Sequence, residues 1–126
     1  MTSPVRTARE VVQAYNLELW NGKRFELAEE LIADNMIRHD VGESTTLTRA
    51  QALKRVTDTW SEMDSLRFDL NIVIDGGDGE HVAMVWDSTM TKGEDDVKVA
   101  SIEVFRVVNG QIVEVWNCGY KLGAWA

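Results

Sequence analysis

Residues 101–116 read SIEVFRVVNGQIVEVW, two apolar runs joined by Asn109-Gly110. A two-residue type I′ turn needs positive φ at both central positions, which asparagine followed by glycine adopts at little cost. The stretch therefore predicts a β-hairpin with strands over residues 97–108 and 111–118. Because side chains alternate along a strand, one face of the first strand carries Val99, Ser101, Glu103, Phe105 and Val107.

Two further strands are predicted before this hairpin. Residues 66–74 alternate between apolar and polar side chains, and the apolar face holds Leu66, Phe68, Leu70, Ile72 and Ile74. A glycine-rich turn at 76–79 leads into a second strand over 80–91, and the polar segment 92–96 connects that strand to the hairpin. The second half of the chain is therefore predicted to form an antiparallel meander.

The first half of the chain has helical periodicity. Ser3-Pro4 signals a helix start, and Asn21-Gly22 marks its end. The apolar stripe of this helix consists of Ala8, Val11, Val12, Tyr15 and Leu19. Tyr15 is therefore expected on the buried side.

Two shorter helices are predicted after it. One covers residues 25–33 and is ended by the polar pair at 34–35, and a short strand follows at 36–40. The other begins at Thr48, which forms a capping box with Gln51 because each side chain satisfies a free backbone N–H group of the first turn. Its inward residues are predicted to be Ala50, Leu53, Val56 and Trp60.

Three helices followed by a meander predict an α+β fold that spans residues 1–126 as a single domain. We expect a cone-shaped α+β barrel, in which a curved antiparallel sheet wraps around the helices and leaves an interior cavity. A polar side chain that faces an apolar cavity needs either a partner or a function. The candidate site is therefore sought among inward polar residues.

Composition limits the classes of partner. The chain has 21 acidic and 13 basic residues, a formal net charge of -8, and no Lys/Arg-rich run, so nucleic acid and anionic membranes are not expected partners. Cys118 is the single cysteine, which rules out an internal disulfide, and with two histidines we expect no metal site. Because no apolar run resembles a signal peptide or a membrane span, we expect a cytoplasmic protein.

The order and spacing of four segments resemble the nuclear transport factor 2-like superfamily, especially its ketosteroid isomerase and SnoaL-like polyketide cyclase branches. The segments are YNLELWNGK at 15–23, LIADNMIRHDVG at 31–42, the hairpin at 101–116 and KLG at 121–123. The resemblance covers almost the whole chain. It implies the cone-shaped fold, chemistry without a cofactor, and a homodimer paired through the sheets, whose last strand at 112–116 is apolar.

The resemblance to ketosteroid isomerases implies three catalytic residues. Tyr15 matches the tyrosine of their oxyanion hole, and Asp40 matches their general base. Glu103 stands where they carry a second acid, an aspartate, that stays protonated and donates a hydrogen bond to the enolate. The apolar neighbours of Glu103 favour the same state, because burial raises the pKa of a carboxyl group.

The SnoaL-like branch implies different residues. Many of its members place a histidine that faces the cavity at the position of His39. Its cyclases use an aspartate directly after the tryptophan that ends the last strand, whereas here Asn117 follows Trp116. Because His39 and Asp40 are neighbours on one strand, only one of them is expected to enter the cavity. Either is therefore a candidate proton acceptor.

Each candidate has a structural alternative. Tyr15 can be a core aromatic residue, Asp40 a turn carboxylate before Gly42, and Glu103 an outward charge paired across the sheet. Arg38 is expected to be a surface or cross-strand charge. The aromatic and polar residues assigned to substrate binding are Trp20, Trp60, Phe105, Trp116 and Asn117.

Two functions follow from these residues. The first is an enzyme, an isomerase or a polyketide cyclase-like lyase, that transfers a proton on a small hydrophobic carbonyl compound without a cofactor. The second is a non-catalytic binding or dimerisation domain with an apolar ligand pocket. A hydrolytic function like that of limonene epoxide hydrolases fits less well, because their Asp-Arg-Asp set cannot be assembled from this sequence.

Overall fold

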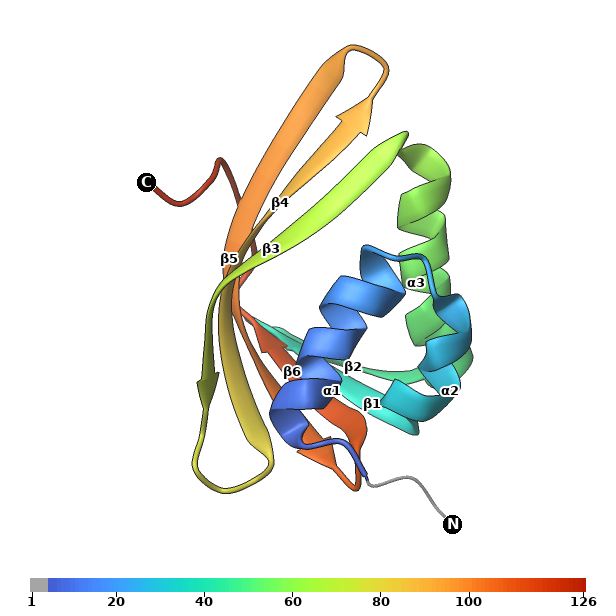
Figure 1. Ribbon diagram of the computed structural model, residues 1–126, viewed down its shortest axis with the longest axis vertical. Coiled ribbons are helices and arrows are strands. Elements are labelled where there is room, and N and C mark those ends of the chain that lie inside the picture. The colour runs from blue at the N-terminus through green and yellow to red at the C-terminus, as the bar shows by residue number, and fades with distance from the viewer. Residues whose placement is uncertain (1–4) are drawn as a thin grey trace.

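A computed structural model describes residues 5–126 and shows helices packed inside a curved sheet (Figure 1). The helical segments are α1 (Ala8–Ala14) with its π-helical continuation η1 (Tyr15–Trp20), the 3-10 turn η2 (Phe25–Leu27) with α2 (Ala28–Leu31), and α3 (Arg49–Glu62). The strands are β1 (Ile32–Asp40), β2 (Glu43–Thr48), β3 (Ser65–Asp75), β4 (His81–Lys92), β5 (Asp95–Val108), β6 (Gln111–Asn117) and β7 (Lys121–Leu122). The predicted α+β class with three N-terminal helices is confirmed.

The strands form one sheet in the order β2-β1-β6-β5-β4-β3, and β7 adds to β5. All neighbouring strands are antiparallel except β1 and β6, which are parallel. The predicted purely antiparallel sheet is therefore wrong at this one pairing. Figure 1 shows α1, α2 and α3 gathered on the concave side of the sheet, with the long strands β3, β4 and β5 curving past them.

The first helix begins later than the sequence signals suggest. Thr7 is its N-cap: the Thr7 hydroxyl accepts a hydrogen bond from the Glu10 N–H, and the Glu10 carboxylate accepts one from the Thr7 N–H. This capping box places the first helical residue at Ala8, so the start predicted from Ser3-Pro4 is wrong for residues 5–7, while 3–4 lie outside the described residues. The predicted end is confirmed, because η1 ends at Trp20.

The second helix is shorter than predicted, because β1 begins at Ile32. Residues 34–35 therefore do not end a helix but continue β1, where Asn35 pairs with Thr48 of β2. The strand β2 was not predicted from the sequence. Five of its six residues are exposed, so it lacks the apolar alternation by which a half-buried strand is recognised.

The third helix begins as predicted. Thr48 and Gln51 form the expected capping box. The buried residues of α3 are Ala52 and Val56, with Leu53 and Trp60 partly buried, whereas Ala50 is exposed. The predicted inward face is therefore correct except at Ala50, in the first turn, where Ala52 is the buried residue.

A register shift in β3 reverses its alternation. The pairing with β4 slips between Leu70 and Ile72, so that the next inward residue is Val73. Ile72 and Ile74 therefore lie on the outer face, 50% and 55% exposed, and not on the predicted apolar face.

The hairpin of β5 and β6 matches the prediction closely. Asn109 and Gly110 have φ angles of 51° and 77°, as a type I′ turn requires. The alternate residues of β5 predicted to share one face are buried: Val99, Ser101, Glu103, Phe105 and Val107. Within residues 5–126, no helix is long and apolar enough to cross a membrane.

Candidate active site

A cavity of about 150 Å³ lies between the helices and the concave face of the sheet. Its walls come from η1, α3 and the strands β1, β3, β4, β5 and β6. Most of the lining is apolar, with the large side chains Trp20, Met36, Phe68, Trp86, Met90 and Phe105. A cavity of roughly this volume holds a single six-membered ring.

Tyr15 contributes a phenol to this cavity. The residue is the first of η1, and its ring packs edge-on against Phe105 with the ring centroids 5.9 Å apart. Burial raises the pKa of the Tyr15 hydroxyl above its ordinary value, so the phenol is protonated at neutral pH and can donate a hydrogen bond.

Glu103 contributes a carboxyl group from β5 and is 9% exposed. Burial raises its pKa above the ordinary glutamate value. The side-chain amide of Asn117, the charge of Arg38, the indole of Trp86 and the charge of Arg55 act in the opposite direction. Glu103 is the one Asp or Glu side chain among the cavity-lining residues that the structure describes. Proton exchange with a bound molecule would therefore fall to this side chain.

Asn117 lies directly opposite Glu103 in the pairing of β5 with β6. Its Oδ1 accepts hydrogen bonds from the Gly119 N–H at 2.6 Å and from the Ser101 hydroxyl at 3.5 Å. Because the amide oxygen is occupied, the NH₂ group is the part of Asn117 left to donate within the cavity. An amide does not take up a proton near neutral pH, so Asn117 can orient a bound molecule but cannot exchange a proton with it.

The indole N–H of Trp86 is a further hydrogen-bond donor of the cavity lining. This N–H is buried and close enough to the Glu103 carboxyl group to lower its pKa, but it makes no hydrogen bond of good geometry with any residue in 5–126. A buried polar group without a partner is costly, which favours a ligand oxygen as its acceptor.

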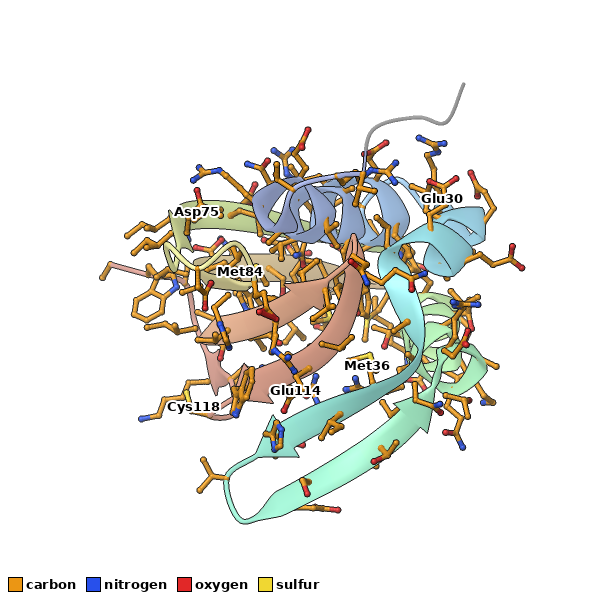
Figure 2. All side chains as sticks on the ribbon, turned by 90° about the horizontal axis from the view of Figure 1, so that it is seen from below. Glu30, Met36, Asp75, Met84, Glu114 and Cys118 are labelled. Atoms are coloured by element: carbon orange, nitrogen blue, oxygen red, sulfur yellow. The ribbon has the colours of Figure 1, made fainter. Side chains whose placement is uncertain are left out.

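Two arginines also line the cavity, and sequence reasoning missed both. Arg38 extends inward from β1 with its side chain 17% exposed, so the expectation of a surface charge is wrong. Arg55 reaches the cavity from α3, one turn after the buried Ala52. The available signal was spacing: Arg38 follows the buried Met36 by two residues on a strand, and Figure 2 shows Met36 inside the fold.

His39 does not enter the cavity. It lies on the outer face of the sheet, where its Nε2 is 2.8 Å from a Glu114 carboxylate oxygen and its ring stacks on Trp116 with centroids 5.0 Å apart. The expectation that His39 faces the cavity is therefore wrong. Figure 2 labels Glu114 on β6, beside β1. The alternation of β1 explains the result, because Met36 and Arg38 occupy the inward positions on either side.

Asp40 is not among the cavity-lining residues either. It ends β1, is exposed, and its carboxylate lies 3.6 Å from the Nε of Arg38. Asp40 is two residues after Arg38, so alternation places both on the same face of β1. At Asp40, however, the strand extends beyond the cavity, and the chain turns at Gly42. The structure thus brings together Tyr15 and Glu103 but not Asp40.

Three of the five residues expected to bind substrate line the cavity: Trp20, Phe105 and Asn117. Trp60 does not, because its indole N–H donates to the Trp20 carbonyl at 2.9 Å, outside the lining. Trp116 does not, since it lies on the outer face against His39.

A curved mixed sheet closed over helices, with a buried carboxyl group and a phenol in one cavity, defines an α+β protein of the nuclear transport factor 2-like fold. Within this class the chain belongs to the SnoaL-like polyketide cyclase family, whose model matches residues 9–125.

Three solved structures illustrate the similarity. A proposed polyketide cyclase from Acidithiobacillus ferrooxidans is 21% identical over 92% of this chain and 89% of its own, with a TM-score of 0.75. A SnoaL-like polyketide cyclase from Agrobacterium tumefaciens is 17% identical over 93% of both chains, with a TM-score of 0.74. An LEH-like epoxide hydrolase from M. tuberculosis is 15% identical over 90% of this chain and 82% of its own, with a TM-score of 0.74. At these identities the likeness concerns the fold. No curated protein sequence matches the chain.

Proposed function

We propose that this protein is a cofactor-independent enzyme that transfers a proton on a small hydrophobic carbonyl compound, with Glu103 as the group that takes and returns the proton. The observation that carries the proposal is that one acid, Glu103, shares an apolar cavity with the protonated phenol of Tyr15. Membership of the SnoaL-like polyketide cyclase family supports an enzyme of this type.

In the proposed reaction, the Glu103 carboxylate removes a proton from the carbon next to the substrate carbonyl. The resulting enolate oxygen accepts hydrogen bonds from the Tyr15 hydroxyl and from the indole N–H of Trp86. Glu103 then returns the proton to another carbon, so that the double bond moves and no atom is gained or lost. A pKa raised toward the working pH suits this exchange, because a base near that pH is both available and strong enough.

This assignment differs from the one drawn from sequence resemblance, in which Asp40 or His39 takes the proton and Glu103 only donates a hydrogen bond. Neither Asp40 nor His39 lines the cavity, whereas a base must come within hydrogen-bond reach of the proton that it removes. The pH dependence separates the two assignments. If Glu103 is the base, the rate rises with pH through its pKa; if it is the protonated donor, the rate falls.

The test uses cyclohex-3-enone, a ring-sized ketone whose isomerisation to the conjugated enone is followed by ultraviolet absorbance. We expect Glu103→Gln to lower kcat/KM by about a hundredfold or more, the usual effect of losing a general base. Tyr15→Phe is expected to lower it by about a hundredfold to a thousandfold, as for the loss of one enolate donor. Glu62→Gln, at an exposed carboxylate of α3, is the matched control and should leave the rate unchanged.

An unchanged rate in Glu103→Gln, or a large loss in Asp40→Asn with Glu103→Gln unaffected, would remove Glu103 from the proposed role. The non-catalytic binding domain would be favoured by two results together. The wild type would be no more active on this ketone than Glu103→Gln, and mass spectrometry of the purified protein would find a defined apolar ligand. That second function draws its support from Asn117, because the aspartate that the cyclases carry at this position is absent.

A further inference from the structure

The charged side chains around the cavity are unbalanced. Arg38, Arg55 and Glu103 are the ionisable Lys, Arg, Asp and Glu residues of the lining. An arginine keeps its charge in any protein environment, so the two guanidinium groups outnumber the single Glu103 carboxyl group whether or not that group is ionised. The cavity of a chain with a formal net charge of -8 is therefore cationic.

The two guanidinium groups are poorly paired within the protein. Arg38 has one ion-pair partner in residues 5–126, the half-exposed carboxylate of Asp40, and the pair is loose because the contact to Nε is 3.6 Å long. None of the ion pairs formed among those residues includes Arg55. By contrast, Arg106 on the outer face binds both Glu80 and Glu114.

Both charges are close enough to the proposed reacting groups to act on them. Arg38 and Arg55 lower the pKa of Glu103 and oppose the rise in the pKa of Tyr15. The side chain of Arg38 is mostly buried, while Arg55 is exposed on α3, so the pair lies along the path from the cavity interior to solvent.

We propose that the substrate carries an anionic oxygen group, a carboxylate or a phosphate, which Arg38 and Arg55 bind at the mouth of the cavity. The inference rests on the proposed function and specifies its substrate class. A guanidinium fork binds planar oxyanions through paired, charge-assisted hydrogen bonds, which suits either group. The cavity has room for about one six-membered ring. The substrate is thus a ring-sized carbonyl compound with its acidic group directed outward.

The experiment measures binding and does not depend on turnover. Benzoate, phenyl phosphate and the neutral, similarly shaped benzamide are titrated against the full chain at low salt, by calorimetry and by the fluorescence of Trp20 and Trp86, which line the cavity. We expect at least one of the two anions to bind about tenfold or more tightly than benzamide, the usual gain from charge-assisted hydrogen bonds. The better anion identifies the group.

Variants assign the preference to the two arginines. Arg38→Gln and Arg55→Gln should each weaken anion binding by about fivefold or more and leave benzamide binding unchanged. Arg67→Gln is the matched control, because Arg67 is exposed and pairs with Asp69 away from the cavity. If Arg38→Gln fails to fold, two measurements still test the inference. They are anion binding by Arg55→Gln, which changes an exposed residue, and the ratio of benzoate affinity to benzamide affinity in the wild type.

Equal binding of benzamide and both anions, or an anion preference that survives in Arg55→Gln and Arg38→Gln, would overturn the inference. Its failure is distinguishable from failure of the proposed function. If Glu103→Gln binds benzoate as well as the wild type but cyclohex-3-enone turnover never depends on Glu103, anion recognition stands and the proton-transfer role falls. If turnover depends on Glu103 but no anion is preferred, the reverse holds.

Discussion

Replacing Asn117 by aspartate tests the electrostatic account of the cavity most directly. The substitution is nearly isosteric, and the new carboxylate can keep the hydrogen bonds that the Gly119 N–H and the Ser101 hydroxyl now donate to Oδ1. It removes the amide donor that lowers the pKa of Glu103. It also introduces an acid at the position where the resemblance to the cyclases implies one.

The size of the effect follows from the pairing of β5 with β6. Glu103 and Asn117 are directly opposite, and such pairs on one face of a sheet have their Cβ atoms about 5 Å apart. Two like charges at this separation repel by about 3 kcal/mol at an effective dielectric constant of about 20, which corresponds to roughly two pKa units. Loss of the amide donor acts in the same direction. The higher apparent pKa of the carboxyl pair should therefore lie about two units above that of Glu103 in the wild type.

The assay is a titration of the glutamate side-chain carboxyl carbons by ¹³C NMR, with the Glu103→Gln spectrum used to assign the Glu103 signal. It requires no substrate, so it tests the geometry of the cavity separately from its chemistry. Circular dichroism and urea unfolding of Asn117→Asp at acidic pH show whether the fold is retained. A Glu103 titration that is unchanged in folded Asn117→Asp would show that the two side chains do not share one low-dielectric space, and the reasoning would fail.

Three further predictions concern stability and assembly. Burial raises the pKa of folded Glu103 above its unfolded value, so the contribution of Glu103 to the free energy of unfolding is complete below the unfolded pKa and is lost as pH rises through the folded pKa. In urea unfolding, Glu103→Gln should therefore gain stability relative to the wild type with rising pH. Parallel plots of unfolding free energy against pH for the two proteins would contradict this. Thr48→Ala should cost about 1 kcal/mol of unfolding free energy, whereas Thr57→Ala, whose hydroxyl bonds only the Lys54 carbonyl, should cost less. The homodimer expected from sequence remains a prediction: Ile72, Val85 and Ile102 lie opposite one another on the outer face of β3, β4 and β5, so light scattering should give twice the chain mass, and Ile102→Asp should give a monomer.

Local signals in the sequence predicted much of this fold correctly. The Asn109-Gly110 turn and the capping box of Thr48 and Gln51 each depend on residues within one turn, so no distant contact is needed to recognise them. The alternation of β5 also placed Glu103 and Phe105 on the inner face, because nothing interrupts the strand between them. Glu103, the acid of the candidate site, is one of these two correctly placed residues.

Features set by pairing with distant strands were predicted less well. A register shift against β4 sends Ile72 and Ile74 outward, and no residue type at 70–72 marks it. In β1 alternation required His39 and Asp40 to face opposite sides but did not fix which side was inner. Arg38 was expected to be a surface or cross-strand charge, because a charged residue on a half-buried strand usually faces solvent, yet its side chain is 17% exposed and lines the cavity.

A single acid in the cavity also limits the chemistry that the site can perform. Hydrolysis of an epoxide needs one group to activate water and another to protonate the leaving oxygen, and the Asp-Arg-Asp set expected of limonene epoxide hydrolases contains two acids. Here Arg38 and Glu103 are present, but the position opposite Glu103 is an amide. One carboxyl group can, however, remove a proton and return the same proton, which is all that isomerisation of a carbonyl compound requires. The arrangement of Glu103, Asn117 and Tyr15 is therefore better matched to proton transfer within one molecule than to the addition of water.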